Sequence, residues 1–266
     1  MLQSLRPLFG LGLLLGACSP PTETRHLVAS ERAPLIPEAE DDERAFATLR
    51  RGEVVEVVRS VRTLDWKAEL EDEKATRAGE LLELRRSGWE GAAFGFRSDL
   101  GGEVQVPTAP WLCRAMHGDD QCTPRLRRFY VGDALIAWEP CQIGACRVAL
   151  VRGRSVKTIT VDGLADLYAA KVEGMDVLIG MTRWVKSPVW TGATTEIIRI
   201  GDRLMRSLTI NSEELDSRAA PVIQRMGTVK IEGGVLTYRG SRREILPSNG
   251  ALMANKPIVE TYHIAK

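Results

Sequence analysis

Residues 195–210 read TEIIRIGDRLMRSLTI. A run rich in β-branched residues covers 195–200, a Gly-Asp pair follows it, and an alternating apolar and polar run covers 204–210. β-Branched residues favour strands, and glycine supplies the positive φ that tight hairpin turns require. The stretch therefore predicts a β-hairpin. Arg206 interrupts the apolar face of the second run, which is typical of an edge or barrel-rim strand.

Three further stretches have the same form of a strand-like run, a glycine-bearing turn and a second run. They are 129–131 with 134–138, 147–151 with 156–161, and 229–231 with 235–238. Residues 258–264 resemble a final strand. The turn glycines have no fixed spacing, so no regular repeat is indicated.

These signals predict a mainly β fold with few short helices. An antiparallel meander, a sandwich and a propeller-like arrangement all fit this rhythm of strands and turns. Helical interruptions are expected at 162–171 and 213–223. We expect one folded domain over 43–266, and a sub-boundary near 100–104 marks where the strand pattern becomes clear.

The first part of this domain is harder to interpret. Residues 54–61 carry valines at helical spacing, although their β-branched character suits a strand. Residues 69–82 are charged, contain alanine and fit a helix. Residues 81–86 and 92–97 fit two strands joined by a turn. The sequence therefore predicts a small mixed or mainly β segment between residues 43 and 100.

The start of the chain has the layout of an export signal. Residues 1–7 carry one positive charge, Arg6, residues 8–15 are apolar, and Gly16 and Ala17 are small. The apolar stretch is far shorter than the ~20 residues that span a bilayer. Leu15-Gly16-Ala17-Cys18 resembles the lipobox of bacterial lipoproteins, and this resemblance covers only residues 1–18.

The resemblance implies cleavage before Cys18, a lipid on its sulfur and an acylated amino terminus. The protein would then be anchored in the cell envelope, since several buried acyl chains hold a protein firmly on a membrane. Ser19 stands where an aspartate would favour inner-membrane retention, so the outer membrane is favoured. An ordinary secreted protein with an incidental Cys18 is the alternative.

Residues 18–42 are expected to form a flexible tether. They contain several prolines and the acidic run 38–42, and few apolar residues. Such composition does not support a packed core.

Four further cysteines fall at positions 113, 122, 141 and 146. An even number of cysteines in an exported chain indicates disulfides, and short spacings favour Cys113–Cys122 and Cys141–Cys146. A Cys₄ zinc site is the alternative, but the two spacings, with eight and four residues between the cysteines, together fit poorly with the usual zinc ligand pairs. We therefore expect two disulfides and no metal or other cofactor.

Charge gives no indication of a nucleic-acid partner. The full chain has a formal net charge of +1, so loss of Arg6 with the leader leaves it formally neutral. Binding to nucleic acid normally requires a basic excess. We expect the membrane, through Cys18, and envelope proteins as partners.

Few residues carry a signal for chemistry. His117, Asp119 and Asp120 lie between Cys113 and Cys122, where a histidine and two carboxylates could bind a metal or act as acid and base. A solvated turn explains the same residues, because glycine and aspartate favour turns.

Trp184 and Trp190 form the densest tryptophan pair. The pair fits an aromatic platform for a glycan or a protein, or ordinary packing in a β domain. The chain has no nucleophile elbow, His-Glu-x-x-His or P-loop motif.

The function expected from these features is non-catalytic: a lipid-anchored binding or scaffold component of an envelope assembly. Transport, surface motility, adhesion and wall maintenance all fit. An enzyme acting on envelope glycans through carboxylates is one alternative. A periplasmic ligand-binding sensor is the other.

Overall fold

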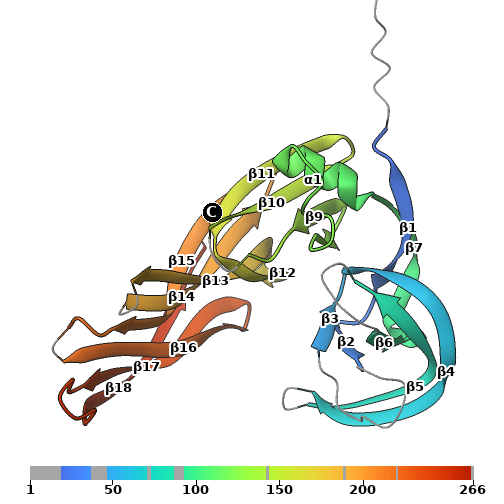
Figure 1. Cartoon of the computed structure of the whole chain (residues 1–266). Helices are drawn as coiled ribbons and strands as arrows, with labels where there is room; N and C mark the ends of the chain where they lie inside the picture. Colours follow the sequence, from blue (N-terminus) through green and yellow to red (C-terminus); the bar gives the residue numbers. More distant parts are fainter. Residues whose placement is uncertain are drawn as a thin grey trace, which may run out of the picture.

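The structure is a computed structural model that describes residues 19–36, 47–70, 73–86, 93–141, 144–187, 190–219 and 221–264. Within them, the side chains of residues 67–75 and 186–190 are not described. The described chain forms four antiparallel sheets of five, two, four and seven strands, with a single α-helix (Figure 1). The mainly β, antiparallel class predicted from the sequence is confirmed.

The N-terminal unit combines the five-stranded and two-stranded sheets. The five-stranded sheet has the order β6-β5-β4-β1-β7, and β2 pairs with β3. Leu35, Leu49, Leu82 and Leu84 are buried between these strands. The strands are β1 (Thr22–Val28), β2 (Arg32–Leu35), β3 (Ala47–Arg50), β4 (Val54–Leu70), β5 (Glu73–Arg85), β6 (Ala93–Phe96) and β7 (Leu100–Pro107), with a short 3₁₀ turn, η1 (Arg97–Asp99), before β7.

The prediction of a flexible tether over residues 18–42 is wrong for its central part. β1 lies between β4 and β7, and β2 pairs with β3. Val28, Leu35 and Ile36 are buried, so apolar residues of this stretch contribute to the core. Pro34 is tolerated because β2 has a hydrogen-bonded partner on one side alone. Residues 18 and 37–42 lie outside the described residues.

The helix suggested for residues 69–82 is also wrong. β5 pairs with β4 along its whole length, and this long ladder overrides the helix propensity of its alanine and charged residues. The two strands suggested for 81–86 and 92–97 are confirmed as the paired ends of β5 and β6. β7 runs through the suggested sub-boundary at 100–104 and completes the N-terminal sheet.

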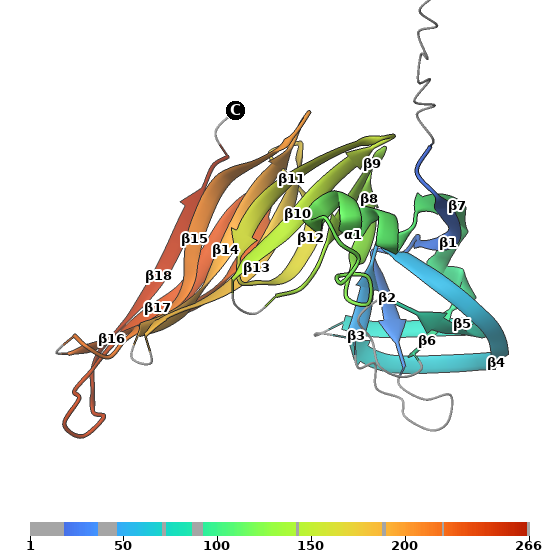
Figure 2. The same cartoon turned by 45° about the horizontal axis from the view of Figure 1, so that its top comes forward.

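The middle of the chain forms one helix and a four-stranded sheet of order β11-β10-β9-β8. Leu112 and Met116 of the helix share a buried cluster with Leu135 and Ala149 of the sheet. Figure 2 shows the helix beside this sheet. These elements are α1 (Ala109–His117), β8 (Arg127–Val131), β9 (Ala134–Trp138), β10 (Ala145–Arg152) and β11 (Ser155–Asp162).

The last part of the chain forms a seven-stranded meander in chain order, β12 to β18. One face of this meander packs against the side of the four-stranded sheet that points away from α1. Trp138, Val148, Leu178 and Ile198 are buried together there. The strands are β12 (Leu164–Val172), β13 (Met175–Ser187), β14 (Trp190–Ile200), β15 (Leu204–Asp216), β16 (Val222–Glu232), β17 (Val235–Ile245) and β18 (Leu252–Tyr262).

The seven-stranded sheet curls on itself. Val177 and Ile197 share a buried cluster with Leu236 and Ile264, so the final strands pack over the first ones. The Glu173 carboxylate in the β12–β13 turn accepts a hydrogen bond from the backbone N–H of Ile264 at 3.2 Å.

The four predicted hairpins are confirmed as β8–β9, β10–β11, β14–β15 and β16–β17, and the predicted last strand is part of β18. Gly132, Gly153 and Gly233 have the expected positive φ. Gly201 does not, because the β14–β15 turn is a three-residue loop in which its N–H donates to the Arg203 carbonyl.

The described residues show neither the two predicted helical segments nor a propeller-like arrangement. Residues 162–171 and 213–223 were expected to contain helices, and both fall mainly in strands because pairing with β13, β14 and β16 decides their conformation. The described sheets hold five, two, four and seven strands, so they are not the four-stranded blades of a propeller.

Both predicted disulfides are present, Cys113–Cys122 and Cys141–Cys146. The first joins α1 to the loop before β8, where both cysteines are buried. The second closes the loop between β9 and β10. The alternative of a Cys₄ zinc site is thereby excluded for this oxidised state, because no thiolate remains among these four residues.

Candidate functional site

One face of β13, β14 and β15 carries an array of polar side chains beside Trp184. The ladder register aligns the array in three rows, each crossing the three strands. The rows are Trp184–Gly192–Glu214, Thr182–Thr194–Asn211 and Gly180–Glu196–Thr209. Leu178 and Ile198 continue the same face into the buried core with the four-stranded sheet. The face therefore becomes polar and aromatic where that core ends.

These side chains line a pocket of about 290 Å³. Asp162, at the end of β11, and Arg206, on β15, complete its wall. The volume is near the lower end of the roughly 300–1,000 Å³ of small-molecule sites. We call this site the Trp184 pocket.

A glycine makes room for the indole of Trp184. A Cβ at Gly192 would overlap the Trp184 ring and the Glu213 carbonyl oxygen. Because Gly192 has no side chain, the ring lies close against the backbone of β14. Trp184 also lines the pocket, together with the polar side chains of the neighbouring strands.

The floor of the pocket is held by charged and hydroxyl contacts. The Glu196 carboxylate lies 3.0 Å from the Arg206 guanidinium and accepts a hydrogen bond from the Thr209 hydroxyl at 2.9 Å. The hydroxyls of Thr182 and Thr194 hydrogen-bond each other. Arg206 also donates to the Thr160 carbonyl, at 3.2 Å. These contacts fix the side chains before any ligand arrives, which lowers the entropic cost of binding.

The pocket carries more negative than positive charge. Asp162, Glu196 and Glu214 contribute three carboxylates against the single guanidinium of Arg206. Polar donors and acceptors beside an indole face suit a polyhydroxylated ring that stacks on the aromatic and hydrogen-bonds at its rim.

Of the binding residues predicted from the sequence, the structure places Trp184 in this pocket. Trp184 lines the pocket, whereas the side chain of Trp190 lies outside the described residues. A two-tryptophan platform therefore stays a prediction.

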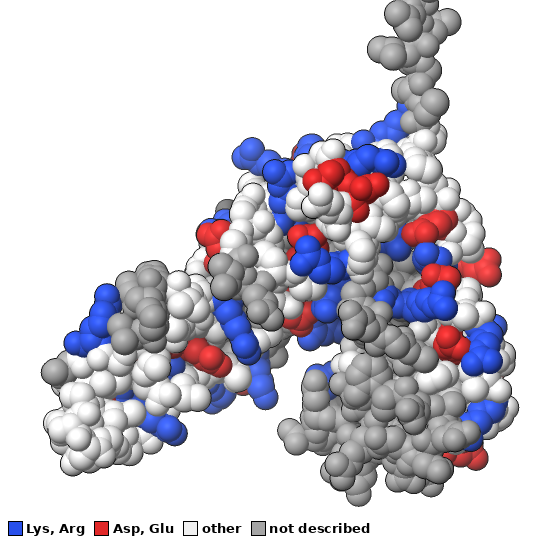
Figure 3. All heavy atoms as spheres, viewed as in Figure 1, with Lys and Arg blue, Asp and Glu red and all other residues white. Residues whose placement is uncertain are grey.

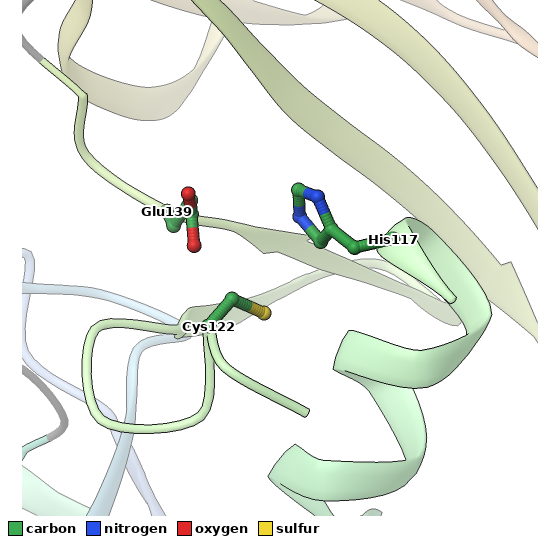
Figure 4. Close-up of side chains that lie close together, drawn as sticks. All are labelled: His117, Cys122 and Glu139. Atoms are coloured by element: carbon green, nitrogen blue, oxygen red, sulfur yellow. The ribbon is translucent and has the colours of Figure 1, made fainter. Parts of the chain in front are cut away.

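His117 lies at the C-terminal end of α1 and points toward Glu139, which follows β9 (Figure 4). The Nε2 of His117 and one carboxylate oxygen of Glu139 are buried without a hydrogen-bond partner among the described residues. The ligand atoms of His117, Glu139 and Cys122 lie within 4.8 Å of one another. Because the Cys122 sulfur is bonded to Cys113, this group offers two ligands, and a zinc site needs at least three from the protein.

Asp119 and Asp120 do not join His117. The Asp119 carboxylate accepts the backbone N–H of Gln121 at 3.1 Å, and the Asp120 carbonyl accepts from Thr123. Both aspartates are exposed. These contacts are those of a solvated turn, which was one of the two interpretations of this loop.

A larger hollow, about 1,080 Å³, lies between the N-terminal unit and β12. Two of its charged residues, Arg50 and Glu53, have partners beside it: Arg50 lies 3.0 Å from Asp166, and Glu53 lies 3.3 Å from Arg86. Burial raises the pKa of Glu53, more than the nearby arginines and a backbone hydrogen bond lower it. The Arg50–Asp166 pair joins the N-terminal unit to the seven-stranded sheet, so we interpret the hollow as a structural junction.

Sequence reasoning missed most of the Trp184 pocket. The sequence pattern that could have revealed the pocket is an i, i+2 spacing of polar or aromatic residues on three neighbouring strands. The pairs are Thr182 with Trp184, Thr194 with Glu196, and Thr209 with Asn211. Alternating residues of a strand share one face, so each pair marks a polar stretch on a face that is apolar elsewhere.

Comparison of the chain with protein-family models, curated proteins and solved structures finds no match. No helix within the described residues is long and apolar enough to cross a membrane. Cys18 and the export signal lie outside the described residues.

Proposed function

We propose that this protein is a lipid-anchored envelope protein that binds a glycan, without catalysis, in the Trp184 pocket. The observation that supports the proposal most is the ordered polar array around one indole on β13, β14 and β15. Stacking on Trp184 supplies apolar contact to a sugar ring, and Thr182, Thr194 and Asn211 supply hydrogen bonds.

The charge of the pocket narrows the glycan class. Three carboxylates against one guanidinium repel an acidic sugar and favour a neutral or amine-bearing one. The Glu196 carboxylate already contacts Arg206 and Thr209, which suits a role in positioning these two side chains.

The proposed location in the cell envelope rests on Cys18 and on the presence of two disulfides. The two disulfides support an oxidising compartment, because such bonds persist outside the cytosol. Intact-mass measurement of protein purified from membranes tests the anchor. We expect a diacylated or triacylated form that starts at Cys18, and its loss in Cys18→Ala.

Calorimetric titration with soluble oligosaccharides tests the binding function. The probes are oligomers of N-acetylglucosamine, of glucosamine and of a uronic acid. We expect binding of the first or second, at least tenfold weaker binding of the third, and loss of binding in Trp184→Ala.

Two asparagines provide a matched control for this titration. Asn211 lines the pocket, whereas Asn255 is exposed on β18 outside it. Asn211→Ala should weaken binding and Asn255→Ala should not. Equal binding by wild type and Trp184→Ala would refute the proposed site.

Glycan hydrolysis is the second candidate function. It is favoured by the presence of Asp162 and Glu214 in the same pocket, because glycoside hydrolysis uses paired carboxylates. Release of reducing ends from the bound oligosaccharide, abolished in Glu214→Gln with binding retained, would support it over simple binding.

We propose that envelope proteins contact the opposite face of β13, β14 and β15, together with the neighbouring strand β16. Met181, Val185, Leu215 and Met226 are exposed there in neighbouring ladder rows. Exposed apolar groups of this kind suit protein contact. Recovery of the same envelope proteins by wild type and Met226→Asp would argue against this face as the contact.

A further inference from the structure

The chain start is held against the folded body. The Ser19 hydroxyl accepts a hydrogen bond from the Arg154 guanidinium at 3.2 Å, and Arg154 lies in the β10–β11 turn. Two residues later, the Pro21 carbonyl accepts from the backbone N–H of Thr108 at 2.9 Å. β1 begins at Thr22. The described chain thus has no free spacer between Ser19 and the first strand.

Three hairpin turns meet at this end of the molecule. Arg152 donates to the Gly201 carbonyl at 2.9 Å and lies 4.0 Å from Asp133 and from Asp202. Lys157 donates to the Asp202 carbonyl at 2.8 Å. These contacts tie together the β8–β9, β10–β11 and β14–β15 turns. We call the surface formed by Ser19 and these three turns the turn face.

The turn face has an excess of positive charge. Arg152, Arg154, Lys157 and Arg203 contribute four basic side chains, and Asp133 and Asp202 contribute two carboxylates. All but Arg152 are exposed. Figure 3 shows basic side chains at the end of the molecule where β1 begins.

We infer that the turn face lies directly on the membrane, against anionic lipid headgroups. The inference rests on the lipid at Cys18 in the proposed function. Neighbouring Cα atoms are about 3.8 Å apart, so a lipid on residue 18 enters the bilayer beside the Arg154 turn. Basic side chains near an anionic surface are attracted to it, so an excess of two positive charges reinforces the orientation that the lipid imposes.

This placement also orients the Trp184 pocket. The pocket lies on β13, β14 and β15 of the seven-stranded sheet. This sheet extends away from the turn face toward the β17–β18 turn (Figure 2). A body fixed in this way presents the pocket at a set distance from the membrane, whereas a flexible tether would vary that distance.

Two serines allow a matched test of this orientation. Ser155 is exposed on the turn face, and Ser248 is exposed in the β17–β18 turn at the far end of the sheet. Lipidated full-length Ser155→Cys and Ser248→Cys proteins, each carrying a fluorophore on the new cysteine, are placed in phosphatidylglycerol vesicles that contain headgroup spin labels. We expect at least threefold stronger quenching at position 155 than at position 248.

Basic variants test the headgroup contact. Arg154→Gln with Lys157→Gln should reduce quenching at position 155 in phosphatidylglycerol vesicles to the level seen in phosphatidylcholine. Lys256→Gln, an exposed lysine on β18, serves as the control and should change nothing. Equal, weak quenching at positions 155 and 248 by protein that floats with the vesicles would overturn the inference. Failure to float, with no acyl mass, would instead overturn the lipid anchor.

Discussion

Glu196 and Arg206 form an ion pair in which the carboxylate is buried and the guanidinium is half exposed. Their closest atoms are 3.0 Å apart, and the side chains are 8% and 47% exposed. The pair crosses from β14 to β15 on the floor of the Trp184 pocket. It brings a carboxylate into a largely buried position that an apolar strand residue would normally occupy.

Removal of Arg206 should destabilise the protein. In Arg206→Ala the Glu196 carboxylate stays buried with the Thr209 hydroxyl as its described partner, which we expect to cost about 1–3 kcal/mol in the free energy of unfolding. Urea unfolding followed by circular dichroism measures the change. Arg206→Lys, which keeps the charge, should lose less, and equal losses in the two variants would contradict the role given to the ion pair.

Gly192 should be intolerant of any side chain. The Cβ of Gly192→Ala would overlap the Trp184 ring and the Glu213 carbonyl, so we expect a loss of about 1–3 kcal/mol from overpacking and a displaced indole. Unfolding and Trp184-dependent binding of oligosaccharide measure the two effects.

Gly201 is the matched control for this substitution. It also lacks a positive φ, and its nearest neighbour to a new Cβ would be the Arg203 carbonyl at an ordinary 3.7 Å. Gly201→Ala should stay within about 0.5 kcal/mol of wild type. A Gly192→Ala protein with wild-type stability and binding would show that the indole does not need this space.

The Cys113–Cys122 disulfide should add more to the free energy of unfolding than the packing of its side chains alone explains. Its loop spans nine residues, and closing a loop of that size stabilises a fold by about 2–3 kcal/mol in the chain-entropy model. The double variant Cys113→Ala with Cys122→Ala should lose at least this amount in urea unfolding. A reductant opens the Cys141–Cys146 disulfide as well, so reduced wild type should lose at least as much stability as the variant. A reductant that leaves wild-type stability unchanged would contradict this.

Glu53 should make the pH dependence of stability unusual. Burial raises its folded-state pKa above the ordinary 4.5, so the stabilising form is the protonated one. Its contribution is full below pH 4.5 and is lost as the pH rises through the raised pKa. Glutamine cannot ionise, so Glu53→Gln should gain stability relative to wild type between pH 4 and pH 7.

Urea unfolding of both proteins at several pH values measures this difference. The direction in which this stability difference changes with pH decides the prediction. A Glu53 whose pKa was lowered by Arg86 would give the opposite trend. A constant difference across the range would mean that Glu53 ionises equally easily in the folded and unfolded states.

The sequence indicated the hairpins well because their signal is local. Each combined β-branched runs with a short turn, and residues 147–151 with 156–161 became the β10–β11 ladder without a break. The disulfide pairing followed in the same way from short loops. Local signals also failed in places: β12 and β5 carry helix-forming residues that long-range pairing holds in strands.

The Trp184 pocket was only partly predictable for a similar reason. Trp184 stood out as an aromatic residue, but Glu196 and Arg206 acquire their roles from the register of β14 against β15, including a bulge. No spacing within one strand reveals that register. The position of Ser19 on the β10–β11 turn depends on contacts across most of the chain and had no sequence signal.

Glycan binding at Trp184 can be followed in the indole region of a ¹⁵N–¹H NMR spectrum recorded during titration with N-acetylglucosamine or glucosamine oligomers. Assignment by single Trp→Phe variants identifies the Trp184 signal. We expect that signal to shift saturably while those of the buried Trp66 and Trp138 stay in place. Saturable binding that leaves the Trp184 signal unmoved, or no binding by the folded protein, would contradict the account.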